Sequence, residues 1–376
     1  MRRRSVLAGA VGLSAIGTAA ATGTLLGMKG VLATDTVPVA DRPGHGSLTY
    51  EWDAVERVTS RDGLVELGAI ASADGATWVI GKKHLTDLSG IRPCVFRRDG
   101  DQWTEIPHPI DQNGAFTDLA VLAPDDVWMV GGVADAKEQH APVVLHWDGT
   151  AWTRKPLRAK GDGGLSEVMI AADRSVWATH WSDRGDRVFR LDGDAPQELD
   201  PGLDSRDCLR LWAGTATDLW CAADSGLSHF DGQDWRRADD GLPAEGFPQS
   251  MAGSALDDMW CVGAVGMDTQ SRAFALHHDG RAWTEVPVPA GIALLNHVVV
   301  REDLVVAVGQ KWPSPDDPMA ASAPYVLELR DGRFVEVTGP EAEVNAILGE
   351  ILAAAFSESE LWVVGTADDS FVARTR

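Results

Sequence analysis

The chain contains few cysteines, few tyrosines and few basic residues. Its 376 residues include 4 Cys, 2 Tyr and 33 Lys or Arg, and the 56 Asp or Glu produce a net charge of -23. A polyanion of this strength repels phosphate groups, so nucleic acid is excluded as a partner and an anionic lipid surface is disfavoured. The sequence has no HExxH or CxxC motif and no glycine-rich phosphate loop, so we expect no metal and no cofactor.

The four cysteines are too few and too scattered to form the disulfide framework of a small exported domain. Cys221 and Cys261 each follow the tryptophan of a repeated motif, so they should point the same way and not face each other. Cys208 and Cys221, on adjacent expected strands, form the only plausible disulfide. We favour buried free thiols and keep that pair as the alternative.

An export signal is predicted at the N-terminus, over residues 1–33. This segment has a basic tip, then a mildly apolar stretch rich in Ala, Gly and Leu, and no acidic residue. The run Arg3-Arg4-Ser5-Val6-Leu7 resembles the twin-arginine signal, which carries folded proteins across a bacterial membrane. Val31-Leu32-Ala33 offers a small-residue cleavage site, and residues 34–47 have the place of a linker. We expect a secreted or cell-surface protein that contacts a membrane only if the signal stays uncleaved.

Tryptophan is unusually frequent, with 15 residues, and most of them belong to a repeat. The runs Asp-Asp-Val-Trp-Met-Val-Gly at 125–131 and Asp-Asp-Met-Trp-Cys-Val-Gly at 257–263 show its full form. Shorter versions bring the motif to seven positions, 40–56 residues apart. Their central residues are Trp78, Trp128, Trp177, Trp220, Trp260, Val306 and Trp362.

A second recurring element is an Asp-Gly pair with an aromatic residue shortly after it, as in Asp148-Gly149 before Trp152. Asp-Gly between apolar runs predicts a hairpin with a type I′ turn, because glycine tolerates positive φ. Each unit then has four antiparallel strands, and such a unit repeated around an axis is typical of a β-propeller. The Gly-Gly pair at 131–132 and the aromatic–Asp pairs resemble kelch and galactose-oxidase-type blades. We predict an all-β, seven-bladed β-propeller over residues 48–376.

The two chain ends are predicted to share the last blade. The motif has seven positions but only six Asp-Gly turns follow, and the last unit ends after its third strand, Phe371–Arg374. An orphan strand, Leu48–Trp52, precedes the first unit. Trp52 lies 26 residues before Trp78, close to the 25 residues that separate Trp103 from the next motif tryptophan. We therefore expect Leu48–Trp52 to complete the last blade and remove an exposed sheet edge.

The motif tryptophans are expected to fill the wedge-shaped gaps between blades. Burying one indole removes about 150–250 Å² from water, which is worth about 4–6 kcal/mol before entropy is subtracted. The pair His277-His278 lies at an Asp-Gly turn and is expected to be exposed.

Two tryptophans fall outside the repeat, in the long and variable loops. Loops that join strands two and three share one propeller face with the loops that join blades, and variable loops on a rigid scaffold are where binding residues usually lie. Trp181 and Trp312 are in such loops, where an exposed indole could stack on a sugar or anchor a protein partner. Packing of the indole against its own loop is the alternative.

Polar residues recur in the first strand of each blade, which should line the central channel. They lie about ten residues before the motif position. A ring of such groups could hold a small polar ligand or a cation, and a hydrated channel without a ligand is the alternative. The candidate ligand-binding residues are Asp118, Glu167, Arg210, Asn296 and Glu350.

No catalytic constellation accompanies this framework. Neither Tyr50 nor Tyr325 is followed by the His that a copper site of the galactose oxidase type needs, and neither is placed as a sialidase nucleophile. Asp118 and Glu167 could supply a carboxylate pair for glycoside cleavage. We predict a secreted, monomeric, non-enzymatic binding scaffold for an extracellular glycan or protein. The alternative is an extracellular carbohydrate-active enzyme, a hydrolase or lyase, with carboxylates at the channel mouth.

Overall fold

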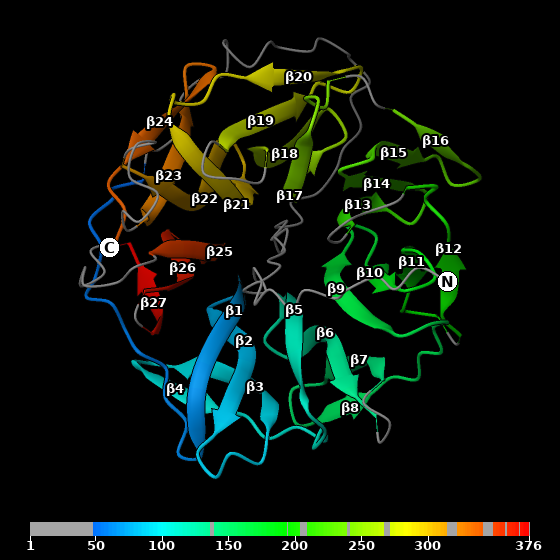
Figure 1. Ribbon diagram of the computed structural model, residues 1–376, viewed down its shortest axis with the longest axis vertical. Coiled ribbons are helices and arrows are strands. Elements are labelled where there is room, and N and C mark those ends of the chain that lie inside the picture. Colours follow the sequence, from blue (N-terminus) through cyan, green and yellow to red (C-terminus); the bar gives the residue numbers. More distant parts are fainter. Residues whose placement is uncertain are drawn as a thin grey trace, which may run out of the picture.

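The computed structural model describes residues 48–376, except 136–138, 194, 204–208, 239–240, 267–270, 314–321, 341–348, 358, 368 and 376. The predicted signal, 1–33, and linker, 34–47, lie outside the described residues. The described chain forms seven antiparallel sheets around a central axis (Figure 1). This confirms the predicted all-β, seven-bladed β-propeller. Within the described residues, no helix is long and apolar enough to cross a membrane.

Within each blade the strands are numbered from the centre of the ring outward, and the first two strands are the longest. The innermost strands are β1 (Gly63–Ala73), β5 (Gly114–Ala123), β9 (Gly163–Ile170), β13 (Arg210–Thr215), β17 (Gly246–Ala255), β21 (Ile292–Arg301) and β25 (Glu350–Ser357). The second strands, which carry the tryptophan motif, are β2 (Ala76–Leu85), β6 (Asp126–Ala134), β10 (Val176–Ser182), β14 (Asp218–Ala223), β18 (Asp258–Val265), β22 (Leu304–Trp312) and β26 (Glu360–Thr366).

In blades one to six, the two outer strands form the hairpin that holds the Asp-Gly turn. The third strands are β3 (Ile91–Asp99), β7 (His140–Trp147), β11 (Arg187–Arg190), β15 (Gly226–Phe230), β19 (Arg272–His278), β23 (Ala323–Arg330) and β27 (Ser370–Arg374). The fourth strands are β4 (Gln102–Glu105), β8 (Trp152–Arg154), β12 (Gln197–Leu199), β16 (Trp235–Arg237), β20 (Trp283–Val286) and β24 (Arg333–Val337).

The innermost strands form a closed circle, because each contacts the innermost strand of the next blade and β25 contacts β1. The second strands are covered on both faces. The run Val127–Val130 of β6 is therefore apolar throughout rather than alternating, and all four residues are buried. Antiparallel pairing places the strand two-to-three loops and the loops between blades on one face, which we call the loop-bearing face.

The N-terminal segment completes the seventh blade, as predicted. Trp52 forms an antiparallel bridge with Thr375, directly after β27. The corresponding pair in blade two is Trp147 with Trp152. Trp52 therefore has the fourth-strand position that its spacing predicted, and Figure 1 shows the blue N-terminal segment beside the red β27.

The extent of this closing strand differs from the prediction of Leu48–Trp52. Pairing begins at Trp52 and continues to Glu56, whose amide donates a hydrogen bond to the carbonyl of Val372 at 2.8 Å. The reason is visible in the other blades, where the fourth strand starts near its aromatic residue and runs onward from it, as β8 does. Leu48 and Tyr50 instead pack against the core of blades five to seven.

The motif residues are buried between blades, which confirms their predicted role. In blade one, the Trp78 ring has its centroid 5.7 Å from those of Trp147 and Trp152 in blade two. The centroids of Trp362 in blade seven and Trp103 in blade one are 6.0 Å apart. The buried set includes Trp78, Trp128, Trp177, Trp220, Trp260, Val306 and Trp362.

Two local predictions were wrong: that the Asp-Gly pairs generally form type I′ turns, and that His277-His278 is exposed. A type I′ turn, with positive φ at both central residues, occurs at Asp331-Gly332. At Asp148 the loop is longer, and the carboxylate closes it by accepting hydrogen bonds from the amides of Thr150 and Ala151, each at 2.9 Å. The pair His277-His278 is buried and not exposed, because the preceding strand extends through both residues.

Cys94, Cys221 and Cys261 are buried free thiols, in agreement with the interpretation that we favoured. Burial raises the pKa of the Cys261 thiol to about 12. Cys208 lies outside the described residues, so the alternative pair with Cys221 is not described.

Candidate functional site

The polar side chains of the innermost strands connect neighbouring blades. Asp118 on β5 is fully buried, and its Oδ2 accepts a hydrogen bond from the amide of Val168 on β9 at 2.6 Å. In three other blades, the side chain at the same register position of the innermost strand accepts an equivalent hydrogen bond from an amide of the next blade. These bonds join Glu167 to the Leu211 amide at 2.8 Å, Ser250 to the Val298 amide at 3.3 Å, and His297 to the Ala354 amide at 3.2 Å. We call these four bonds the inter-blade bonds.

Arg210 compensates the charge of one of these carboxylates. Its Nη1 lies 3.8 Å from Glu167 Oε1, and both side chains are buried. The same guanidinium donates from Nε to the Pro248 carbonyl at 3.2 Å and from Nη2 to Gln249 Oε1 at 3.1 Å. One side chain thus spans three blades, and an opposite charge offsets the desolvation that a buried carboxylate suffers.

Asn296 and Glu350 lie together where blade six meets blade seven. Asn296 Nδ2 donates to the Ile351 carbonyl at 2.8 Å. Burial raises the pKa of the half-buried Glu350, against the opposing effect of a hydrogen bond from Asn296. The five channel candidates therefore form local contacts between blades, and their role in ligand binding stays a prediction.

Trp181 lies near the end of β10 on the loop-bearing face and is half-buried. Its ring centroid is 5.9 Å from that of His140 on the neighbouring blade, and the His140 amide donates to Asp162 Oδ1 at 2.7 Å. Gly164 pairs with Trp181, and a Cβ there would lie 3.4 Å from the indole nitrogen. The indole is therefore held by its neighbours but keeps part of its surface in solvent.

Trp312 is the last residue of β22, in blade six, and is also half-buried. Blades three and six are not neighbours, so Trp312 and Trp181 belong to separate places on the loop-bearing face (Figure 1). The Pro-rich loop that follows Trp312 lies at 314–321, outside the described residues.

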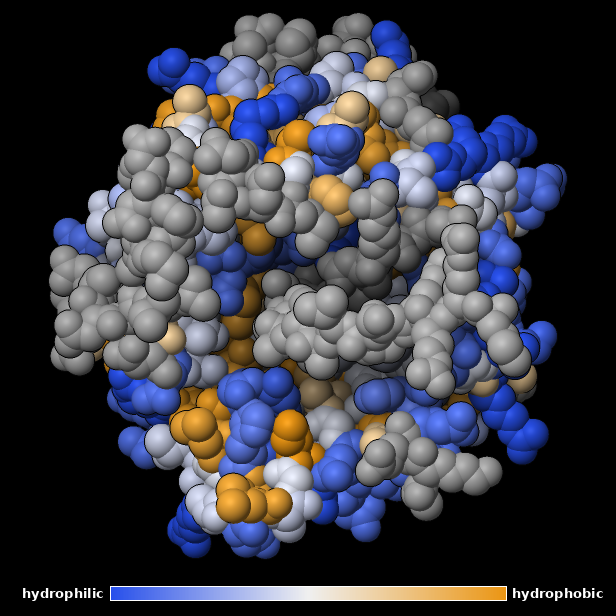
Figure 2. All heavy atoms as spheres, in the orientation of Figure 1, coloured by the Kyte–Doolittle hydropathy of each residue, from blue (hydrophilic) through white to orange (hydrophobic). Residues whose placement is uncertain are grey.

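The structure shows an exposed apolar tip that the sequence analysis missed. Leu88, in the loop after β2, is 92% exposed, and Leu64, near the start of β1, is 58% exposed. Both residues lie at the same end of the β1–β2 hairpin, because Gly63 pairs with Leu85. Figure 2 shows hydrophobic side chains gathered over blade one, at the bottom of the view. The signal in the sequence is a single leucine within the polar turn Asp87-Leu88-Ser89-Gly90.

A groove of about 650 Å³ lies where the ring closes, and the sequence analysis also missed it. The N-terminal segment forms one side. The end of β24 and the loop between β26 and β27 form the other. Its lining includes Tyr50, Trp52, Asp53, Arg57, Thr338 and Phe371. No local sequence pattern predicts this groove, because ring closure alone brings these segments together.

The described part of the chain contains no cluster of metal-ligating side chains. No group of three or more His, Cys, Asp or Glu side chains there is arranged to hold a metal ion. Three His–carboxylate pairs do occur, between the second and third strands of blades two, four and five. The pairs are His146 with Asp126, His229 with Asp218, and His277 with Asp258. Each imidazole also packs against the motif tryptophan of its blade, with ring centroids 4.5 Å apart.

No protein-family model and no curated protein matches the sequence. Solved structures match the fold. YCF48 bound to D1 peptide is 14% identical, has a TM-score of 0.57, and aligns over 91% of this chain and 99% of its own. YCF48 from Cyanidioschyzon merolae is 12% identical with a TM-score of 0.55, over 86% of this chain and 99% of its own.

A third similar structure is the extracellular domain of the putative one-component system BT4673 from B. thetaiotaomicron. It is 10% identical with a TM-score of 0.55, and the match covers 86% of this chain and 40% of that chain. At these identities the similarities establish the β-propeller fold, and they support no more than the fold.

Proposed function

We propose that this protein is a secreted, non-enzymatic binding scaffold that holds a protein partner on the loop-bearing face of blades one to three. The observation that carries the proposal is the Leu64–Leu88 tip. Leu88 is almost fully exposed and has a φ of +60°, which costs a non-glycine residue of order 1 kcal/mol. The strained backbone at Leu88, together with a second exposed leucine at the same end of the hairpin, supports an interaction site here.

The loop that presents Leu88 is held in shape before any partner arrives. The Leu88 amide donates to the Leu85 carbonyl at 3.0 Å, and the Ser89 amide donates to Asp87 Oδ1 at 2.9 Å. Preorganisation lowers the entropy that binding must overcome. Burying Leu88 in a partner would then contribute about 1.5–3 kcal/mol. YCF48, whose fold is similar, has been solved with a bound peptide.

Catalysis by Asp118 and Glu167 has less support. Both carboxylates are buried, and each accepts a hydrogen bond from an amide of the next blade. A glycoside hydrolase needs its two carboxyl groups on either side of an accessible substrate. The contacts seen here favour structural bonds between blades.

Export by the twin-arginine route is part of the proposal. The run Arg3-Arg4-Ser5-Val6-Leu7, which resembles the twin-arginine signal, supports it. One structure with the same fold is itself an extracellular domain.

Photo-crosslinking tests the docking face. Leu88 is replaced by benzoylphenylalanine, the protein is added to the extracellular fraction of its own culture, and crosslinked peptides are identified by mass spectrometry. The partner found is then purified and titrated against variants. Leu88→Asp should weaken its binding at least tenfold, and Trp181→Ala, in blade three, should also weaken it.

Leu256 provides the matched control. It is 47% exposed and lies in the turn between β17 and β18, on the opposite face. Leu256→Asp should leave affinity unchanged. Equal effects of Leu88→Asp and Leu256→Asp would reject the docking face.

A further inference from the structure

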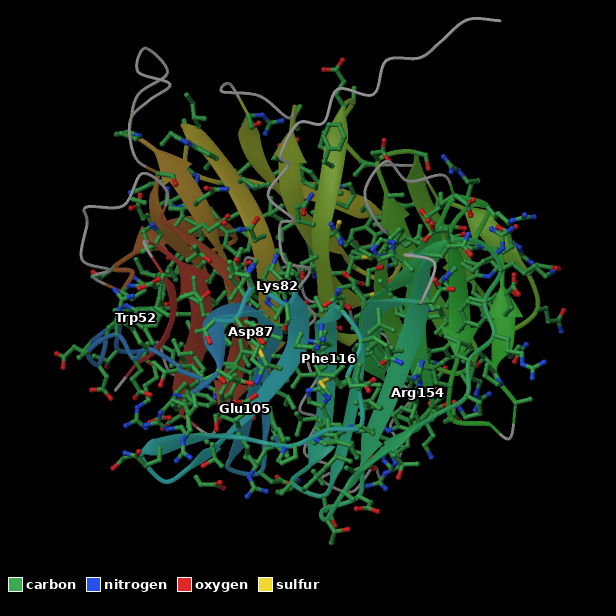
Figure 3. All side chains as sticks on the ribbon, turned by 60° about the horizontal axis from the view of Figure 1, so that its bottom comes forward. Trp52, Lys82, Asp87, Glu105, Phe116 and Arg154 are labelled. Carbon is green, nitrogen blue, oxygen red and sulfur yellow. The ribbon has the colours of Figure 1, made fainter. Side chains whose placement is uncertain are left out.

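The groove at the ring closure has an aromatic wall of fixed orientation. Trp52 and Tyr50 are half-buried in it, and Phe371 is buried beneath. Trp52 Nε1 donates to the Thr338 carbonyl at 2.7 Å, so this bond sets the plane of the indole. Figure 3 shows Trp52 at the rim of the ring, beside the N-terminal segment. The indole therefore offers the groove an apolar face whose polar atom is already bonded.

Charged groups of both signs line the same groove. Arg57 and Asp369 form an ion pair whose side chains are 51% and 47% exposed. The Asp53 carboxylate accepts a hydrogen bond from Arg374 Nε at 2.9 Å. A guanidinium is a donor only and a carboxylate is an acceptor only. A hydroxyl is both, so vicinal hydroxyls of one ligand can bond to the guanidinium and a carboxylate together.

We propose that this groove binds a neutral saccharide. A pyranose ring combines an apolar C–H face, which can stack on the Trp52 indole, with vicinal hydroxyls that suit Arg57 and Asp369. The groove volume of about 650 Å³ lies within the range of roughly 300–1,000 Å³ for small-ligand sites. The net charge of -23 disfavours acidic sugars. This site lies on blades six and seven, whereas the proposed protein-docking site lies on blades one to three, and it takes a different class of ligand.

Saturation-transfer NMR and calorimetry on the purified protein test the site. The probes are cellotetraose, xylotetraose, mannotetraose and maltotetraose, with sialyllactose as the acidic comparison. At least one neutral tetrasaccharide should bind, and sialyllactose should not. Binding of none of the four, or of sialyllactose in preference to them, would overturn the proposal.

Variants locate the binding. Arg57→Ala and Asp369→Asn change exposed side chains, so the fold should survive. Each variant should lower the affinity for the neutral saccharide at least tenfold. The matched control is Arg272→Ala in blade five. It breaks an ion pair in which Arg272 Nη1 lies 2.8 Å from Glu285 Oε1 and both side chains are 48% exposed. If Arg272→Ala weakens binding as much as Arg57→Ala does, the groove is not the site.

Two further variants separate the possible failures. Trp52→Phe keeps an apolar ring but loses the hydrogen bond to Thr338. It should lower the affinity for the saccharide, while circular dichroism should show that the protein is still folded. Leu88→Asp should leave saccharide affinity unchanged. Loss of saccharide binding in Leu88→Asp would contradict the separation of the two sites, whereas failure of protein docking alone would leave the groove unaffected.

Discussion

Glu56 of the closing segment accepts a hydrogen bond from the indole nitrogen of Trp103, the aromatic residue of β4, at 2.8 Å. The contact joins the segment that completes blade seven to the outermost strand of blade one. Arg98 forms an ion pair with the same carboxylate, and its guanidinium lies over the rings of Trp103 and Trp362 at 5.5 and 4.9 Å. The ring is therefore closed by charge and aromatic stacking as well as by strand pairing.

Loss of this carboxylate should weaken the closure. Glu56→Ala leaves the buried Arg98 guanidinium and the Trp103 indole without this acceptor, so we expect the free energy of unfolding to fall by about 1–3 kcal/mol. Chemical denaturation followed by tryptophan fluorescence measures the change. Glu51→Ala, an exposed position on the same segment, is the control and should change stability by less than about 0.5 kcal/mol. Equal effects would show that the carboxylate of Glu56 does not hold the ring.

The inter-blade bonds predict a difference between two replacements of Asp118. Asp118→Asn keeps an oxygen that can accept from the Val168 amide, whereas Asp118→Ala leaves that buried amide without this acceptor. We expect Asp118→Ala to cost about 1–3 kcal/mol more than Asp118→Asn in denaturation experiments. Glu167→Gln should likewise be tolerated better than Glu167→Ala. If Asp118→Asn folds normally but abolishes a measured hydrolytic activity, the enzyme alternative is supported instead.

His180 should make the protein less stable in acid. The side chain is buried, and neither ring nitrogen has a hydrogen-bond partner among the described residues. Burial lowers its pKa from 6.5 to about 4, because the charged form loses its hydration. The unfolded chain takes up a proton near 6.5 and the folded chain only near 4. Stability is therefore lost as pH falls through this window and changes no further below it, by up to about 3 kcal/mol.

The variant His180→Phe isolates this effect. It removes the titrating group, so the fall in stability between pH 7 and pH 4 should be smaller than in the wild type by about 2–3 kcal/mol. Phe189→Leu alters the ring contact of 5.7 Å with His180 without removing a titrating group, and it should lower stability equally at both pH values. An unchanged pH dependence in His180→Phe would mean that the imidazole titrates with the same pKa in the folded and unfolded states.

Export should depend on the arginine pair. Replacing Arg3 and Arg4 by lysine keeps the charge but removes the guanidinium pair that the twin-arginine route reads, so the full-length precursor should accumulate inside the cell. Fractionation and immunoblotting of the two forms measure this. A general secretory signal requires only a basic tip and an apolar stretch, so unchanged secretion of the lysine variant would contradict this route.

Local patterns were enough to predict the architecture, because they recur in every blade. The repeated motif, with tryptophan at six positions and Val306 at the seventh, set the number of blades. The distance from Trp52 to Trp78 predicted the fourth-strand position of Trp52, and the structure pairs it with Thr375. The extent of the closing strand was misplaced because the residues around Trp52 carry no alternating pattern strong enough to bound it.

The contacts of the polar and exposed side chains could not be predicted in the same way. Asp118 and Glu167 were visible as polar residues in apolar strands, but their partners are amides 50 and 44 positions away, in the next blade. The closure groove joins Trp52 to Asp369 across almost the whole chain. Short-range periodicity records which way a side chain faces, and it contains no information about contacts that depend on how the blades meet around the ring.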